Sequence, residues 1–149
     1  MIDAKDRQIL NLMRESARMS HADIGEAIGL STSAVNRRIK LMEQAGVISG
    51  YGALVDEAAV GKGTSVFVQV TLSNQRKHEL ETFEKAAREC PDVAECYLMT
   101  GQADYLLRVA IKDTADYERV HHETLTQLPG VERVISQFAI RLVCRRSGL

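Results

Sequence analysis

The stretch "ADIGEAIGLSTSAVNRRIKLMEQAG", residues 22–46, decides how the first part of the chain folds. Gly29 stands between two segments with helical periodicity, and glycine readily adopts the left-handed conformation that ends a helix. Ser31 follows as an N-cap, because its side-chain oxygen can accept a hydrogen bond from an amide of the next turn. Gly25 provides a small residue where the two helices must cross closely. A short helix, a tight turn and a second helix are typical of the helix-turn-helix arrangement, which this stretch therefore predicts.

Each of the three expected helices in residues 1–46 has a polar start and an apolar face. Asp3 can cap the first helix, with Asp6 three residues further on. Ser20 and Asp23 can begin the second helix with a near capping box. The positions expected to point inward are Ile9, Leu10, Leu12 and Met13 in the first helix, Ile24, Ala27 and Ile28 in the second, and Val35, Ile39 and Met42 in the third.

Positive charge gathers on the third helix. The whole chain has a formal net charge of −1, and its first 50 residues hold seven basic and six acidic residues. Arg37, Arg38 and Lys40 nevertheless lie close together, and no acidic residue falls between Ala27 and Met42. The excess of positive charge is therefore local, as expected if one helix contacts a nucleic acid and the rest of the molecule does not.

The outward positions of this helix have the chemistry that DNA recognition requires. Asn36 can pair with adenine and Arg37 with guanine through two hydrogen bonds each in the major groove. Arg38 and Lys40 suit phosphates, and residues 31–33 lie at a helix N-terminus that favours a phosphate. Two alternatives are a solvated helix face and a helix-turn-helix that contacts protein. The predicted DNA-binding residues are Ser31, Thr32, Ser33, Asn36, Arg37, Arg38 and Lys40.

A second module follows a glycine-rich segment with strand-like content, residues 47–63. The later patterns read strand, helix, strand, strand, helix, strand, and "CPDV" (90–93) and "LPGV" (128–131) mark equivalent positions in a repeat. This order predicts a ferredoxin-like four-stranded antiparallel sheet with both helices on one face. We expect Thr114 to cap the second of these helices and the last strand to span residues 131–143. The overall class is α+β, with a helix-turn-helix domain (1–50) of winged-helix-like type, a linker or connecting strand (51–63) and a ferredoxin-like domain (64–149).

The open face of such a sheet predicts a dimer. Strands with apolar residues on both sides usually cover their second face with another copy. Two helix-turn-helix units would then reach half-sites about 34–36 Å apart, or a multiple of that distance.

Composition argues against several other classes. Three cysteines, Cys90, Cys96 and Cys144, have no histidine at a zinc-like interval, so we expect reduced thiols and no metal or other cofactor. No segment is long and apolar enough to span a bilayer, and no leader begins the chain, so we expect a cytoplasmic protein without membrane contact. An enzyme would have to use residues such as Asp104, Tyr105, His121 and His122. No nucleophile–base pairing is visible among these residues, so we expect a protein that is not an enzyme.

The order of these parts resembles the Lrp/AsnC family of transcriptional regulators. The resemblance covers nearly the whole chain and rests on "DRQIL", residues 22–51, "TGQADYLLRV" and "LPGVERV". It implies a DNA-binding regulator whose dimers commonly form octamers and which responds to a free amino acid. By position, the family's effector site corresponds to Thr100, Gly101, Gln102, Ala103, Asp104 and Tyr105, with Val134 and Ser136 from the last strand. The family often has an acid at the position of Gln102 and a hydroxyl at that of Val134.

The chemistry of the turn at residues 100–105 is compatible with an amino-acid effector. A zwitterion needs an anion for its ammonium and hydrogen-bond donors for its carboxylate. Asp104 can supply the anion, and the amides of residues 101–103 can supply the donors. The alternative is a plain hairpin turn, in which glycine and aspartate serve the backbone.

Overall fold

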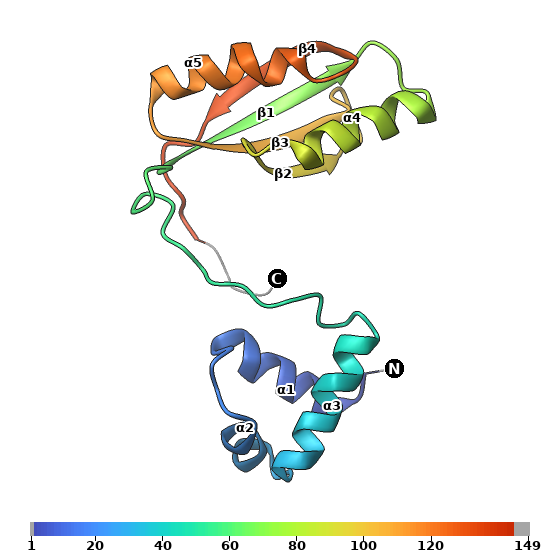
Figure 1. The fold of residues 1–149 in the computed structure, drawn as a ribbon, viewed down its shortest axis with the longest axis vertical. Helices are drawn as coiled ribbons and strands as arrows, with labels where there is room; N and C mark the ends of the chain where they lie inside the picture. The colour runs from blue at the N-terminus through green and yellow to red at the C-terminus, as the bar shows by residue number, and fades with distance from the viewer. Residues whose placement is uncertain (1, 145–149) are drawn as a thin grey trace. The chain divides into compact units, whose positions relative to one another are not determined.

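Three α-helices form the first unit of the chain in a computed structural model that describes residues 2–144 (Figure 1). They are α1 (Ala4–Glu15), α2 (His21–Ile28) and α3 (Thr32–Gln44). The expected inward face of α3 is confirmed, whereas Ala27, expected to point inward from α2, is exposed instead. The buried core of the unit consists of Ile9, Ile24, Val35, Ile39 and Met42.

The predicted caps explain where these helices begin. Asp3 accepts a hydrogen bond from the amide of Asp6 at 2.8 Å, and the amide of Asp3 donates to the Asp6 carboxylate at 2.9 Å, which completes the capping box. Ser20 accepts from the amide of Asp23 at 3.1 Å, but the Asp23 carboxylate accepts from the Ser20 hydroxyl rather than from its amide. Ser31 caps α3 by accepting from the amide of Ala34 at 3.2 Å.

Two glycines set the turn between α2 and α3. Gly29 ends α2 with a φ of +69°, in the left-handed region that favours glycine. A Cβ on Gly25 would lie 2.4 Å from the carbonyl oxygen of Leu30, closer than any side chain allows. The helix-turn-helix prediction is confirmed, and Gly25 is required by the turn itself.

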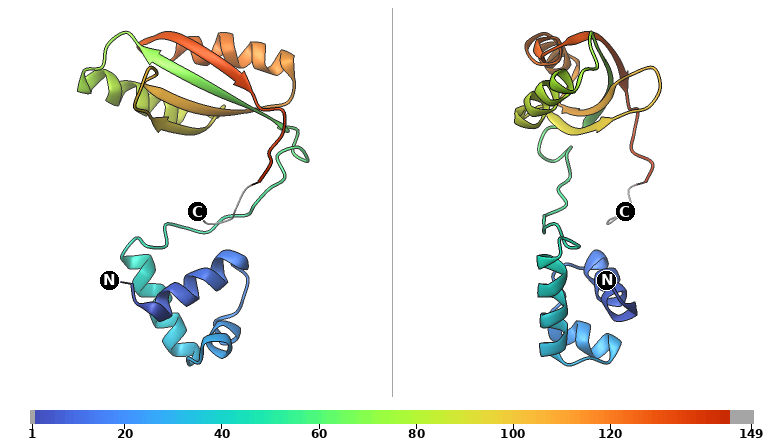
Figure 2. Two further views of the ribbon diagram at one scale, coloured as in Figure 1. Left: turned by 180° about the vertical axis from the view of Figure 1, so that it is seen from behind. Right: turned by 90° about the vertical axis from the view of Figure 1, so that its right-hand side faces the viewer.

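The second unit is a four-stranded sheet with two helices. Its elements are β1 (Thr64–Leu72), α4 (Lys77–Glu89), β2 (Val93–Leu98), β3 (Tyr105–Ile111), α5 (Thr114–Glu123), the short 3₁₀ helix η1 (Leu125–Gln127) and β4 (Val131–Phe138). The strand order is β2-β3-β1-β4, and every neighbouring pair is antiparallel. Figure 2 shows both helices on the same face of the sheet. This is the predicted ferredoxin-like α+β arrangement.

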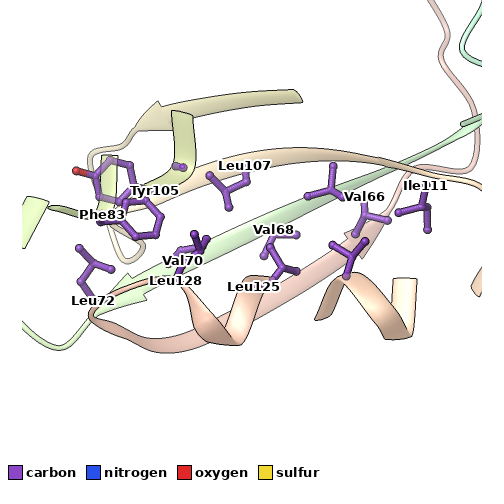
Figure 3. Packing of buried hydrophobic residues seen from close by; sticks show 13 residues of the cluster. Val66, Val68, Val70, Leu72, Phe83, Tyr105, Leu107, Ile111, Leu125 and Leu128 are labelled. Carbon is purple, nitrogen blue, oxygen red and sulfur yellow. The ribbon is translucent and has the colours of Figure 1, made fainter. Parts of the chain in front are cut away.

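Burial alternates along β1, which places the core between sheet and helices. Val66, Val68 and Val70 are fully buried, whereas the residues between them are partly exposed on the other face. Phe83 of α4 packs against the ring of Tyr105, with ring centroids 4.5 Å apart (Figure 3). The helix-covered side of the sheet is therefore a filled aliphatic and aromatic core, and the opposite side remains open.

Two local expectations were wrong. β4 ends at Phe138 rather than near residue 143, because its partner β1 begins at Thr64 and offers one last bond, from the amide of Ala139 to Ser65. The cap of α5 is Asp113, which accepts from the amide of Asp116 at 2.9 Å. Residues 51–63, for which we expect a linker or a connecting strand, form no strand.

Backbone contacts divide the chain into two compact units, the first running to Leu54 and the second spanning Val55–Val143. Within residues 2–144, none of the helices has the length and apolar character needed to cross a bilayer.

Candidate nucleic-acid interface and effector site

The outer face of α3 presents the side chains expected to read DNA. Arg37 and Lys40 are exposed and Asn36 is partly exposed, whereas Val35 and Ile39 of the same helix are buried. Since successive residues turn by about 100° around a helix, the burial of one face leaves the opposite face toward solvent. The structure thus brings an amide and two cations together on one exposed surface.

The N-terminus of α3 is also exposed. Residues 31–33 are all at the surface, and the Ser31 hydroxyl lies 3.1 Å from that of Ser33. The first amides of a helix have no partner within the helix, and its dipole favours an anion there. This end of α3 can therefore receive a phosphate from backbone and hydroxyl groups without an additional cation.

Arg38 has a different environment from its neighbours. Its Nη1 donates to Asp3 at 2.7 Å and to Asp6 at 2.8 Å, both in the first turn of α1 or its cap. The side chain of Arg38 is 23% exposed, and that of Asp6 is 13% exposed. The hydrogen bond from the Asp6 amide, followed by that from Arg38, holds the pKa of Asp3 below its usual range. A phosphate contact by Arg38 would have to compete with these two carboxylates.

The expected effector turn joins β2 to β3. Thr100, Gly101 and Gln102 are exposed, Ala103 is partly exposed, and Gly101 has a φ of +110° that favours glycine. The amide of Met99 donates to the carbonyl of Asp104 at 2.8 Å and closes the turn. Main-chain groups at the tip of this turn are therefore the part most available to a ligand.

Asp104 and Tyr105 point inward and hold the turn. Both Asp104 carboxylate oxygens accept hydrogen bonds at 2.7 Å, one from the amide of Leu72 and one from Gln75. The Tyr105 hydroxyl donates to Glu84 at 2.9 Å, and burial, together with this bond, raises the pKa of Tyr105. An effector ammonium would have to displace a bond that Asp104 already makes.

Val134 and Ser136 lie elsewhere in the sheet. They pair with Val70 and Val68 on the far side of β1 from β3, on the helix-covered face. Ser136 receives a hydrogen bond from the Tyr117 hydroxyl of α5. Within the sheet, β1 therefore separates these two residues from β3 and the turn that precedes it.

Sequence reasoning missed a charged cluster on the open face of the sheet. Arg108 of β3 is only 8% exposed and binds Glu95 at 2.8 Å and Glu57 at 3.0 Å. Although burial opposes the charge, the hydrogen bonds to Glu95 and Glu57 raise the pKa of Arg108. An arginine inside the otherwise apolar strand "YLLRVAI" was the available signal.

No group suited to a metal ion occurs among residues 2–144. The three cysteines have no disulfide partner among these residues: Cys90 is partly buried, and Cys96 and Cys144 are exposed.

A helix-turn-helix with an exposed cationic helix and an α+β domain with an open sheet define a two-domain DNA-binding regulator. Residues 2–49 match the family model of a winged helix-turn-helix DNA-binding domain, and residues 65–149 match that of the Lrp/AsnC ligand binding domain. The chain belongs to the Lrp/AsnC family of transcriptional regulators.

Individual relatives agree with this assignment. The chain is 52% identical over 116 residues to an uncharacterized HTH-type transcriptional regulator of Sinorhizobium fredii, covering 78% of this chain and 91% of that one. It is 39% identical over 147 residues to the Bkd operon transcriptional regulator of Pseudomonas aeruginosa, covering 99% and 96%. The crystal structure of a transcriptional regulator from Neisseria meningitidis in complex with L-Met aligns with a TM-score of 0.92 at 30% identity, covering 100% and 96%.

Proposed function

We propose that this regulator recognises specific DNA sequences through Asn36 and Arg37, while Lys40 and residues 31–33 contact phosphates. The observation that carries the proposal is the exposure of these side chains on α3, opposite the buried face formed by Val35 and Ile39. An amide and a guanidinium on one helix match the major-groove edges of adenine and guanine. Since it acts on DNA, the regulator would work in the cytoplasm of a bacterial cell like those of its relatives.

The open face of the sheet supports a homodimer. Phe67, Leu106 and Ile135 lie on this face, on three neighbouring strands, and Ile135 is 45% exposed. These apolar side chains share the face with Gln69, which lies between Leu106 and Ile135, and apolar residues on an uncovered sheet face are typically covered by a partner. A second copy fits best, because a twofold dimer presents two α3 helices to two DNA half-sites. Further assembly into an octamer follows from the family alone.

A free amino acid is the proposed effector, and the exposed tip of the turn at residues 100–103 is its proposed contact. The L-Met complex of the Neisseria relative supports this class of ligand. The turn offers backbone donors for a carboxylate, whereas Asp104 and Tyr105 serve to hold it in place. Val134 and Ser136, which β1 separates from β3, are proposed to contribute from a neighbouring subunit.

One experiment tests the DNA and effector proposals together. The full chain is used to select bound fragments from random genomic DNA, with and without a pool of the twenty amino acids. We expect enrichment of a two-part motif and a change in enrichment or assembly with at least one amino acid. Recovery of random fragments would contradict sequence-specific binding, and unchanged selection together with no calorimetric binding at millimolar amino acid would contradict the effector.

A further inference from the structure

The first turn of α1 contacts both helices of the helix-turn-helix. Asp3 and Asp6 bind the guanidinium of Arg38 on α3 at 2.7 and 2.8 Å. Lys5, between them, donates to the carbonyl of Ile28 in the last turn of α2. Polar side chains at three positions therefore link the start of α1 to both partners, in addition to the apolar core.

The two carboxylates perform two tasks with separate oxygens. In Asp3, Oδ1 accepts from the amide of Asp6 and Oδ2 accepts from Arg38. In Asp6, Oδ2 accepts from the amide of Asp3 and Oδ1 accepts from Arg38. The cap of α1 and the ion pair to α3 are thus one connected network, in which each bond orients the next.

The charge of this network does not suit a phosphate. Two carboxylates surround one guanidinium, so the cluster of Asp3, Asp6 and Arg38 has a net negative charge. The Asp6 side chain is mostly buried, which strengthens its interaction with Arg38 relative to an exposed pair. A phosphate approaching Arg38 would meet both carboxylates, whereas Arg37 and Lys40 are exposed.

From this geometry, and resting on the proposed DNA recognition by α3, we propose that Arg38 is a positioning residue that fixes the rotation of α3 about its axis. Apolar contacts of Val35, Ile39 and Met42 hold the helix on the core, and the charge-assisted hydrogen bonds of Arg38 add a strongly directional contact. Arg38 lies next to Arg37 along the chain and follows Asn36 by two residues. Its ion pairs with Asp3 and Asp6 therefore set the angle at which Asn36 and Arg37 meet the bases.

The experiment measures binding to a selected specific fragment and to a random fragment across a range of salt concentrations. The variants are Arg38→Gln, Asp3→Asn and Asp6→Asn, with Lys40→Gln as the phosphate comparator and the exposed Arg14→Gln as a matched control. For Arg38→Gln we expect at least a tenfold loss of specific affinity, unchanged affinity for the random fragment and an unchanged salt slope. For Lys40→Gln we expect the slope to decrease by about 0.9.

The carboxylate variants distinguish positioning of α3 from simple competition with a phosphate, because the two roles predict opposite effects on DNA binding. If Asp3 and Asp6 position the helix through Arg38, Asp3→Asn and Asp6→Asn lower the specific-to-random affinity ratio. If they only compete with a phosphate for Arg38, removing their charge raises affinity for both fragments. A smaller salt slope in Arg38→Gln, or an unchanged specific-to-random ratio in all three variants, overturns the proposal.

Two controls distinguish a failure of this proposal from misfolding of a variant and from a failure of the proposed DNA function. Circular dichroism at the assay temperature shows whether each variant is folded, and Asp3→Asn, with a side chain that is 53% exposed in the wild type, decides the question if Arg38→Gln does not fold. If the wild-type chain selects no specific fragment, the proposed DNA function fails. If it selects one and the variants keep its specificity, only the role of Arg38 fails.

Discussion

At Gly25, the absence of a side chain allows the close approach of α2 and the turn that follows it. A Cβ at this position would lie 2.4 Å from the Leu30 carbonyl oxygen, which belongs to the backbone and cannot rotate away. The amide of Leu30 also donates to the carbonyl of Gly25 at 2.9 Å, so the two segments are tied where they are closest. A side chain at this position must therefore push the turn and α2 apart.

We predict that Gly25→Ala destabilises the first unit by about 1–3 kcal/mol, the usual cost of overpacking. Urea unfolding of the full chain followed by circular dichroism measures the change. Gly52→Ala is the matched control, because a Cβ there meets nothing within 4 Å. Equal unfolding midpoints for the two variants would contradict the close approach at Gly25.

Asp104 is a second residue whose role is set by its hydrogen bonds. We predict that Asp104→Ala lowers the stability of the second unit by about 1–3 kcal/mol, because the buried amide of Leu72 loses its acceptor. Thermal unfolding without any amino acid measures this loss, and Gln102→Ala at the exposed tip is the control. A variant with wild-type stability that no longer binds an amino acid would show instead that Asp104 contacts the effector.

Local signals explain which residue roles could be predicted from the sequence. The caps at Asp3 and Ser31 involve residues three positions apart, and the inward face of α3 follows from helical spacing. Arg38 binds Asp3 and Asp6 across separations of 35 and 32 residues, which no local pattern encodes. The prediction that Arg38 contacts a phosphate therefore rested on its residue type and could not take Asp3 and Asp6 into account.

At the scale of elements, ion pairs join helix to strand. Arg119 of α5 donates to Asp92, just before β2, at 3.1 and 3.3 Å, and Thr124 donates to the same carboxylate at 2.9 Å. The Arg119 guanidinium holds the pKa of Asp92 below its usual range, with a further contribution from Thr124. Asp92 thus attaches the end of α5 to the start of an edge strand.

Because of this attachment, the free energy of unfolding should decrease when the pH becomes low enough to protonate Asp92. Because the folded pKa is lowered, the contribution of Asp92 is complete above the ordinary carboxyl pKa of about 3.9 and is lost as pH falls below it. We predict that Asp92→Asn destabilises the protein by about 1 kcal/mol at pH 7 and by much less near pH 2.5. Urea unfolding at both pH values measures the difference, and a constant difference would contradict the assignment.

Element boundaries show where sequence patterns are sufficient. The strand patterns "TSVFVQVTL" (64–72) and "YLLRVAI" (105–111) in the sequence coincide with β1 and β3, since turn residues mark both ends of each. β4 ends five residues earlier than its apolar pattern suggests, because a strand needs a partner and β1 has no further residue to pair. Residues 47–63 include strand-like sequence but form no strand in the structure.

At the scale of the whole molecule, the proposed dimer depends on the open face of the sheet. We predict that Ile135→Asp converts the dimer to a folded monomer, because a charge would be buried against the second copy. Sedimentation velocity measures the mass, and Lys85→Asp on the exposed surface of α4 is the matched control. A wild-type monomer at micromolar concentration, or a dimer that Ile135→Asp leaves intact, would contradict this interface.

The recognition of bases by α3 is the central claim, and Asn36 tests it most directly. Binding-site selection is carried out with the wild-type chain and with Asn36→Ala, followed by affinity measurements on the wild-type motif. We predict that the variant loses base preference at one position in each half-site and binds the motif about 5- to 150-fold more weakly, which corresponds to roughly 1–3 kcal/mol. An identical motif and unchanged affinity for Asn36→Ala would contradict the account.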